Sequence, residues 1–239
     1  MTDRMPTASF AELRASLAGF PGPDEQAMAA ARERQSQLTK PPGSLGMLED
    51  LAVTLAGWQG RDKPVIDKAQ ALVFAGNHGV CAQGVNPFPQ EVTVQMVANF
   101  QHGGAAINQL CAANGCDLSV IALELDRPTG DISQGPAMTE AETLDAIRQG
   151  AAAVDPAAQV LVLGEMGIGN STIAAALALA TFGGTGSDWA GPGTGADGQG
   201  VSHKARVVEQ AVATNRAALA DPLATLAALG GREQAAICG

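Results

Sequence analysis

The fold class follows from one stretch of sequence, Val160-Leu-Val-Leu-Gly164-Glu165-Met166-Gly167-Ile168-Gly169-Asn170-Ser171-Thr172. Its first four residues are wholly apolar, which is typical of a strand buried on both faces of a parallel sheet. Glycines follow, and then an alanine-rich segment that we expect to be helical over about 171–181. A strand, a glycine turn and a helix in this order indicate an α/β protein.

Two more apolar runs, over 71–75 and 118–122, predict two further buried strands. Helices are expected between the strands, over about 90–114 with a break near Gly103-Gly104, and over about 139–154. This alternation predicts a doubly wound, mainly parallel sheet with flanking helices over residues 66–239.

Capping signals fix some helix ends. Thr139 and Glu142 have the spacing of a capping box, and Asp221-Pro222 is a typical start for a last short helix. Between these helices, the glycine-rich segment 183–200 is expected to be irregular.

The N-terminal part has a different, helical pattern. A helix is expected from Asp24 to about Leu38, and it ends at the turn Lys40-Pro-Pro-Gly43. Ser44 is expected to cap a second helix with one apolar face. Residues 1–65 are therefore predicted to form a small helical subdomain.

Composition excludes several classes of protein. The chain has 239 residues, of which 46% are hydrophobic and 3% aromatic, and a net charge of −10. This charge would repel a nucleic-acid backbone. No apolar run approaches the roughly 20 residues of a membrane span, and no secretory signal is recognisable. Four cysteines without a C-x-x-C pair and three dispersed histidines do not suit a zinc site. We expect a cytoplasmic protein with reduced thiols.

The turn after the third strand suits a phosphate. Gly167 and Gly169 let the backbone approach a ligand, and the helix that follows directs N–H groups and the positive end of its dipole to the same point. Asn170 lies in the same turn, and Ser171 and Thr172 add hydroxyl donors. The loop is not a Walker A motif, because no lysine precedes the Ser-Thr pair. A tight turn without a ligand is the alternative.

A second loop, Gly191-Pro192-Gly193-Thr194-Gly195, precedes Lys204. Lysine is a usable counter-charge for phosphate, although many surface lysines are merely solvated. Gly193, Thr194, Gly195 and Lys204 together with the first loop predict one shared anionic site.

A third group of candidates follows the first strand: Asn77, His78, Phe88 and Gln90. Loops at the carboxyl ends of parallel strands line the ligand crevice. Amides, an imidazole and an aromatic ring suit a flat heteroaromatic ligand. The alternatives are turn formation for Asn77, core packing for Phe88 and a hydrogen-bonded structural role for His78. For His78 we favour the structural role over ligand binding.

In this order along the chain, several motifs resemble those of the nicotinate-nucleotide–dimethylbenzimidazole phosphoribosyltransferase family. They are Leu38-Thr-Lys-Pro-Pro-Gly-Ser-Leu-Gly46, Phe74-Ala-Gly-Asn-His-Gly-Val80, Pro89-Gln-Glu-Val-Thr93, Gln95-Met-Val-Ala-Asn-Phe100, Gly103-Gly-Ala-Ala-Ile-Asn108, Gly164-Glu-Met-Gly-Ile-Gly-Asn-Ser-Thr172 and Gly193-Thr-Gly195.

The resemblance implies a reaction of cobalamin biosynthesis: nicotinate mononucleotide and 5,6-dimethylbenzimidazole give α-ribazole 5′-phosphate and nicotinate. It implies a homodimer without a metal or organic cofactor. It also implies that Gly167, Gly169 and Lys204 hold the nucleotide phosphate, that Glu165 faces the ribose or the reacting centre, and that Gln90 touches the benzimidazole.

The sequence also departs from the family pattern. The resemblance places a general-base glutamate in a Gly-Glu-Gly-Thr-Gly motif near the C-terminus, and these 239 residues contain no such motif. Gly193-Thr-Gly195 follows a proline, and Asn86-Pro87 replaces a common Ser-Ala pair. We therefore expect a chain that is short at its C-terminus, with Glu165 as the substitute base. The alternatives are a noncatalytic nucleotide-binding chain and an unrelated phosphate-binding α/β enzyme.

Overall fold

The computed structural model describes residues 8–239. Its sheet contains β1 (Ala69–Ala75), β2 (Cys116–Ala122) and β3 (Val160–Met166). The three strands are parallel and lie in the order β2-β1-β3. Ala75 lies opposite Ala122 on one side and Met166 on the other, so the three carboxyl ends are level. The loops that follow these ends therefore begin at one edge of the sheet.

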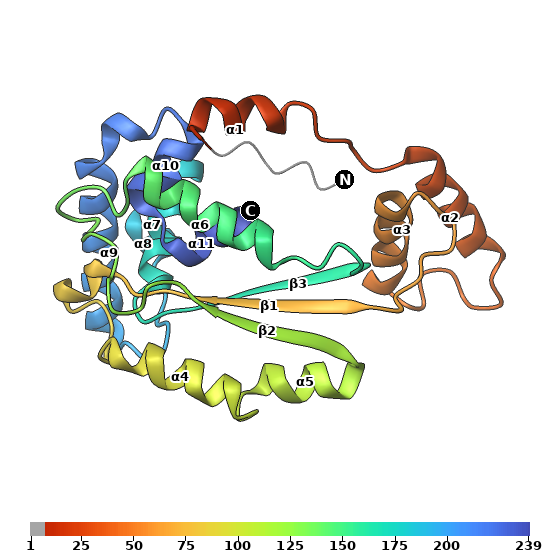
Figure 1. Cartoon of the computed structure of the whole chain (residues 1–239), viewed down its shortest axis with the longest axis horizontal. Helices are drawn as coiled ribbons and strands as arrows, with labels where there is room; N and C mark the ends of the chain where they lie inside the picture. Colours follow the sequence, from red (N-terminus) through yellow and green to blue (C-terminus); the bar gives the residue numbers. More distant parts are fainter. Residues whose placement is uncertain (1–7) are drawn as a thin grey trace.

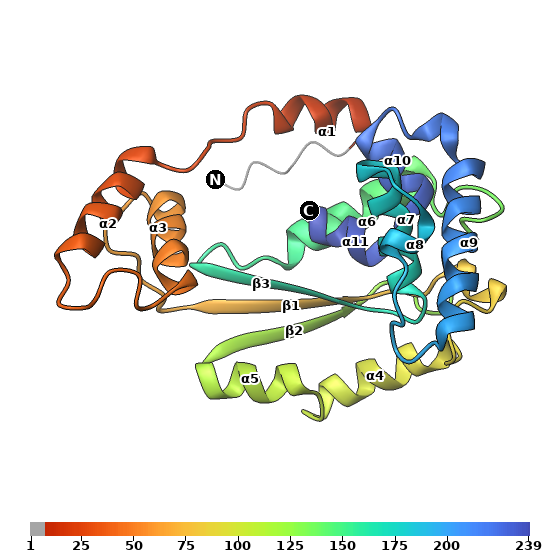
Figure 2. The same ribbon diagram turned by 180° about the vertical axis from the view of Figure 1, so that it is seen from behind.

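Helices cover both faces of the sheet. The crossover from β1 to β2 carries α4 (Glu91–Gln101) and α5 (Ala106–Asn114), and the crossover from β2 to β3 carries α6 (Glu140–Ala153). Figures 1 and 2 show α4 and α5 below the sheet, and α6 with α11 (Arg232–Cys238) above it. The two crossovers lie on opposite faces of the sheet, and β1 lies between β2 and β3. The sheet is therefore doubly wound. The predicted fold class is confirmed.

The remaining helices surround this unit. They are α1 (Phe10–Leu17), α2 (Glu25–Gln37), α3 (Met47–Gln59), α7 (Asn170–Phe182), α8 (Gly186–Trp189), α9 (Gly198–Thr214) and α10 (Pro222–Leu229). Two single 3₁₀ turns, η1 (Gly79–Gln83) and η2 (Arg216–Ala218), complete the structure. No helix in the described range is long and apolar enough to cross a bilayer.

Two hydrophobic clusters support the carboxyl edge of the sheet. Leu72 and Phe74 of β1 are buried in one cluster with Leu123, which follows β2, and with Ala236 of α11. A larger cluster joins α6, α7, α9 and α10, and Ile147 and Ile173 are among its fully buried members. Burying side chains of this size contributes about 1.5–3 kcal/mol each. The loops described below therefore rest on a rigid interior.

Helices α2 and α3 pack on each other beside the amino ends of the strands (Figure 1), around Ala31, Val53 and Ala56. Helix α1 differs, because its Leu13 is buried in the large cluster. The sequence did not predict α1, although Ser9 caps it by accepting a hydrogen bond from the Glu12 amide.

Local signals in the sequence were mostly right. The Asp24 cap, the Thr139–Glu142 capping box, the Asp221 cap and the break near Gly103 are confirmed. The Ser44 cap was wrong, because Gly46 occupies that position at a φ of 55°, where glycine avoids the cost of a side chain. The segment expected to be irregular contains α8.

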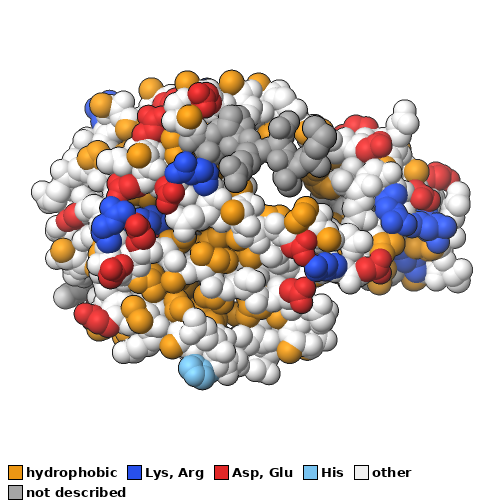
Figure 3. Space-filling view, in the orientation of Figure 1, with side chains coloured by type: hydrophobic (Ala, Val, Ile, Leu, Met, Phe, Trp, Pro, Cys, Tyr) orange, Lys and Arg blue, Asp and Glu red, His pale blue; other side chains and the backbone are white. Residues whose placement is uncertain are grey.

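Strand β3 is an edge strand in the described structure, and its middle is open to solvent. Leu161, Val162 and Leu163 are 36%, 46% and 44% exposed. Figure 3 shows hydrophobic side chains gathered across the middle of this face of the molecule. We call these three residues the apolar edge.

Candidate functional site

Lys204 lies on the buried face of α9. Its helix begins at Gly198 after Asp197, whose carboxylate accepts a hydrogen bond from the Gly200 amide. Val207, Val208 and Ala211 follow Lys204 at helical spacing and are buried with it. The side chain is only 2% exposed, so its aliphatic part packs in the interior while its ammonium group points to the glycine loops.

The Lys204 ammonium group meets two of the predicted loops. Its Nζ atom donates to the Ser171 hydroxyl at 3.2 Å and to the Gly191 carbonyl at 3.1 Å. A Cβ atom at Gly193 would lie 3.0 Å from the Ser171 Oγ and 3.2 Å from the Lys204 Nζ. The structure therefore brings together Lys204, the start of α7 and the turn at Gly193.

Burial lowers the pKa of Lys204. The nearest polar groups are neutral, and the part of the chain that the structure describes places no carboxylate at ion-pair distance from this ammonium group. A buried cation without a counter-charge is costly, and an anion bound beside it would remove that cost.

Backbone amides around this point divide into two groups. The amides of Asn170 and Thr172 donate to the carbonyls of Gly167 and Gly169, and the Ser171 amide donates to the Asn170 side chain. In contrast, the amides of Gly167, Gly169 and Gly193 donate to no acceptor within residues 8–239. The glycine amides are therefore the donors that remain for a ligand, rather than the first turn of α7.

The rest of the second loop lies at the surface. Thr194 and Gly195 are exposed, and the Gly195 amide closes the turn by donating to the Pro192 carbonyl.

Thr172 of the first loop lies inside, fully buried, with a hydroxyl group that has no hydrogen-bond partner among the described residues.

Glu165 is the last residue but one of β3, opposite Phe74. Its Oε2 atom accepts a hydrogen bond of 2.6 Å from the Asn170 side chain. Burial raises the pKa of Glu165, because the surrounding protein disfavours its charged form although the side chain still reaches solvent. A carboxylate of raised basicity beside an anion site is a candidate proton acceptor.

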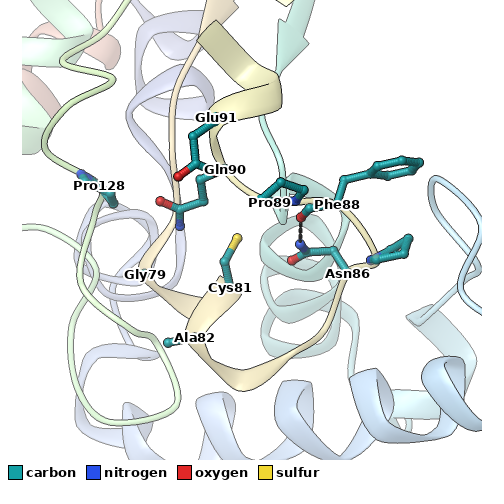
Figure 4. A pocket seen from close by; sticks show the side chains of 10 residues that line it. Gly79, Cys81, Ala82, Asn86, Phe88, Pro89, Gln90, Glu91 and Pro128 are labelled. Atoms are coloured by element: carbon teal, nitrogen blue, oxygen red, sulfur yellow. Dashed lines mark hydrogen bonds between the residues drawn. The ribbon is translucent and has the colours of Figure 1, made fainter. Parts of the chain in front are cut away.

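An open pocket of about 700 Å³ lies over the loop after β1. Its lining includes Cys81, Phe88 and Gln90, and Figure 4 shows the Gln90 amide and the Cys81 thiol pointing toward each other. Gln90 donates to the His78 carbonyl, which fixes its side chain. Phe88 is 46% exposed, and its ring points away from the other two, so the core-packing alternative for Phe88 is wrong.

The pocket and the candidate anion site are neighbours. The Ile168 amide donates to the Thr93 hydroxyl at 3.1 Å, and the Cys81 thiol donates to the Ile168 carbonyl at the same distance. A Cβ atom at Gly169 would lie 2.8 Å from the Cys81 Sγ. The loops after β1 and β3 thus pack directly on each other, and a ligand with a phosphate and a ring could touch both.

Asn77 and His78 point inward rather than into the pocket. Asn77 is buried, and its side chain donates to the Leu125 carbonyl at 2.8 Å. His78 is completely buried, and its Nε2 atom lies 3.0 Å from the Oε1 atom of Glu233.

Sequence reasoning missed Glu233, which lies in the first turn of α11. One signal could have revealed it: Glu233 shares the helix face of Ala236 and Ile237, which pack in the core. A carboxylate on the apolar face of a helix is unusual unless it has a partner.

Comparison with known proteins matches this arrangement to one family. The sequence model of the family described as Phosphoribosyltransferase matches residues 20–239. The chain belongs to this family. The nicotinate-nucleotide–dimethylbenzimidazole phosphoribosyltransferase of Rhodobacter capsulatus is 60% identical over 231 residues, which are 97% of this chain and 69% of that protein. The enzyme of the same name from Ruegeria pomeroyi is 59% identical, over 96% of this chain and 68% of that protein.

Solved structures of the family have the same fold. The crystal structure of CobT from Thermus thermophilus superposes with a TM-score of 0.76 at 40% identity. The superposition covers 88% of this chain and 69% of that one. The resemblance of the motifs is therefore confirmed across nearly all of the sequence.

Proposed function

We propose that this protein transfers the phosphoribosyl group of nicotinate mononucleotide to 5,6-dimethylbenzimidazole, in cobalamin biosynthesis. The bond between C1′ of the ribose and the pyridinium nitrogen breaks, and its electron pair stays with nicotinate. A benzimidazole nitrogen forms the new bond to C1′, and its N–H proton is released. The products are α-ribazole 5′-phosphate and nicotinate.

The observation that carries this proposal is the buried Lys204 ammonium group, which has no counter-charge among residues 8–239. The nucleotide phosphate would bind between Lys204, Ser171 and the free glycine amides, where it would supply the missing negative charge. This contact holds the ribose at the carboxyl edge of the sheet, and positioning of this kind supplies much of the rate enhancement in a transfer reaction.

The base would enter the pocket beside Cys81 and Gln90. That pocket adjoins the anion site through Ile168, so the benzimidazole and the ribose would meet between the two loops. Glu165 lies beside Asn170 at the same edge of the sheet. Its carboxylate would stabilise the positive charge that develops at C1′ and accept the benzimidazole proton.

The test of the activity is the release of nicotinate from a mixture of protein, nicotinate mononucleotide and dimethylbenzimidazole, which chromatography measures.

Lys204→Met should weaken nucleotide binding by about tenfold to a hundredfold, because a charge-assisted hydrogen bond contributes about 1.5–3 kcal/mol. Calorimetry measures that loss. The matched control is Lys63→Met, which removes an exposed lysine and should leave binding unchanged.

The outcomes separate the candidate functions. Binding and nicotinate release support the transferase. Binding without release supports the noncatalytic nucleotide-binding chain, and equal affinity of Lys204→Met and the wild type refutes the phosphate site.

The resemblance also leads us to propose a homodimer in the cytoplasm. The apolar edge supports self-association, because exposed strand edges readily pair with another chain. Sedimentation tests the homodimer, and cell fractionation tests the cytoplasmic location. We further propose that residues 1–65, of which 1–7 lie outside the described range, form a helical subdomain, with α1 as an arm that packs on the α/β part.

A further inference from the structure

The pair of Glu233 and His78 lies directly beneath the candidate site, and the proposed reaction does not use it. Both side chains are 0% exposed, and Nε2 of His78 lies 3.0 Å from Oε1 of Glu233. The two atoms are close without the alignment of a hydrogen bond, and His78 Nδ1 and both Glu233 oxygens have no other partner in the described structure. Buried polar groups left in this state are rare, and their presence calls for an explanation.

Three glycines make room for the pair. A Cβ atom at Gly76 would lie 2.4 Å from Oε2 of Glu233, and one at Gly231 would lie 2.5 Å from both of its oxygens. A Cβ atom at Gly167 would lie 3.0 Å from Nε2 of His78. Because real Cβ atoms rarely approach other atoms so closely, the backbone here fits around the two buried side chains.

The same glycines belong to the site loops. Gly76 follows β1, and its amide donates to the Met166 carbonyl at 3.0 Å. Gly167 follows β3, and its free amide is one of the proposed phosphate donors. The pair therefore packs against the turns that follow β1 and β3, and the second of these turns carries a proposed phosphate donor.

We propose that Glu233 and His78 are a positioning pair, which holds the turns at Gly76 and Gly167 and sets the electrostatic environment of Glu165. This inference rests on the proposed function, since that function places Glu165 at the reacting centre. A buried charged pair is often less stable than an apolar replacement, so its presence beneath the loops is better explained by positioning than by stability.

The charges around Glu165 support this role. Burial is the main cause of its raised pKa, and the hydrogen bond from Asn170 lowers it. The negative charge of Glu233 raises the pKa of Glu165 further, while a positive charge on His78 lowers it. The two members of the pair thus act on Glu165 in opposite directions.

The experiment uses this opposition. Carboxyl ¹³C NMR follows the titration of Glu165 in the full chain, and its signal is identified by its loss in Glu165→Gln. We expect Glu233→Gln to lower the titration midpoint of Glu165 and His78→Gln to raise it. Loosening of the structure would move both midpoints in the same direction, and unmoved midpoints or a common direction would overturn the proposal. If one variant does not fold, the sign of the other decides.

Nucleotide binding gives a second readout. Glu233→Gln should weaken binding of nicotinate mononucleotide about tenfold, because the loops lose their support, whereas Asp145→Asn on the exposed face of α6 should not. Unchanged affinity in Glu233→Gln contradicts the positioning role. A wild-type chain that binds no nucleotide refutes the proposed function instead, and the titration still decides the role of the pair.

Discussion

Gly193 leaves open the space above the Lys204 ammonium group. Its φ of 54° lies in the left-handed region, and a side chain there would lie against Ser171 and Lys204. The position therefore requires glycine for two separate reasons, which are backbone conformation and access to the cation.

Gly193→Ala should weaken binding of nicotinate mononucleotide about tenfold and lower the free energy of unfolding by about 1 kcal/mol. The stability loss comes from backbone strain, and the binding loss comes from the new methyl group. Gly43→Ala is the matched control, because Gly43 has a φ of 73° and open space around it. It should lose the same stability and keep its affinity. Calorimetry and chemical unfolding measure the two effects, and equal binding losses in both variants would refute the explanation by access.

Sequence could predict Lys204 but not the role of Glu233. Two glycine loops and a lysine form a local pattern that suggests an anion site, whichever way the chain folds between them. Glu233 lies beside His78, and the two residues are 155 positions apart in the sequence with no local pattern that links them. Their proximity depends on how α11 packs on the sheet, which no local pattern reveals.

Among the elements, α6 and α11 pack closely against each other. A Cβ atom at Gly150 of α6 would lie 1.7 Å from the Ala236 carbonyl oxygen. A backbone atom cannot rotate aside as a side chain can. The position of α11, and with it that of Glu233, therefore depends on this glycine.

Gly150→Ala should lower the free energy of unfolding by about 1–3 kcal/mol, although alanine favours a helix by about 1 kcal/mol. Gly57→Ala in α3 is the control, because its new methyl group would meet the side chains of Met28 and Pro23 and no backbone atom of a second helix. It should change stability by less than about 1 kcal/mol. Urea unfolding measures both variants, and a stable Gly150→Ala protein would show that α11 can shift freely.

The strands were predicted in place but too short at their ends. Apolar runs located all three strands, but burial on both faces holds only for β1. The expectation that 160–163 would be buried on both faces was wrong, because β3 is an edge strand in the described structure and Leu161, Val162 and Leu163 are exposed. Glycine and glutamate at 164–165 suggested a loop, whereas β3 continues through them to Met166 and pairs with β1. Tertiary pairing decided these positions, and local preference did not.

At the scale of the whole molecule, the sheet has two unpaired edge strands in the described structure, β2 and β3, and β3 carries the apolar edge. Leu161, Val162 and Leu163 lie next to each other on an edge strand. A net charge of −10 makes two copies of the chain repel each other at long range. The apolar edge nevertheless favours contact between two copies at this strand.

Val162→Lys should shift the sedimentation coefficient toward that of a 24.1 kDa monomer, because a charge on a strand edge opposes pairing with a second chain. Leu110→Lys, on the exposed surface of α5, is the control and should leave the association unchanged. A monomeric wild type at micromolar concentration would remove the apolar edge as a dimer interface.

Helix α11 leaves the ribosome after the strands and the glycine turns, yet its glutamate completes the interior under loops that were synthesised much earlier. A nascent chain that still lacks this helix has the lysine and the glycine turns but no support beneath them. If the pair supports the loops as proposed, the nucleotide would bind only after α11 has docked.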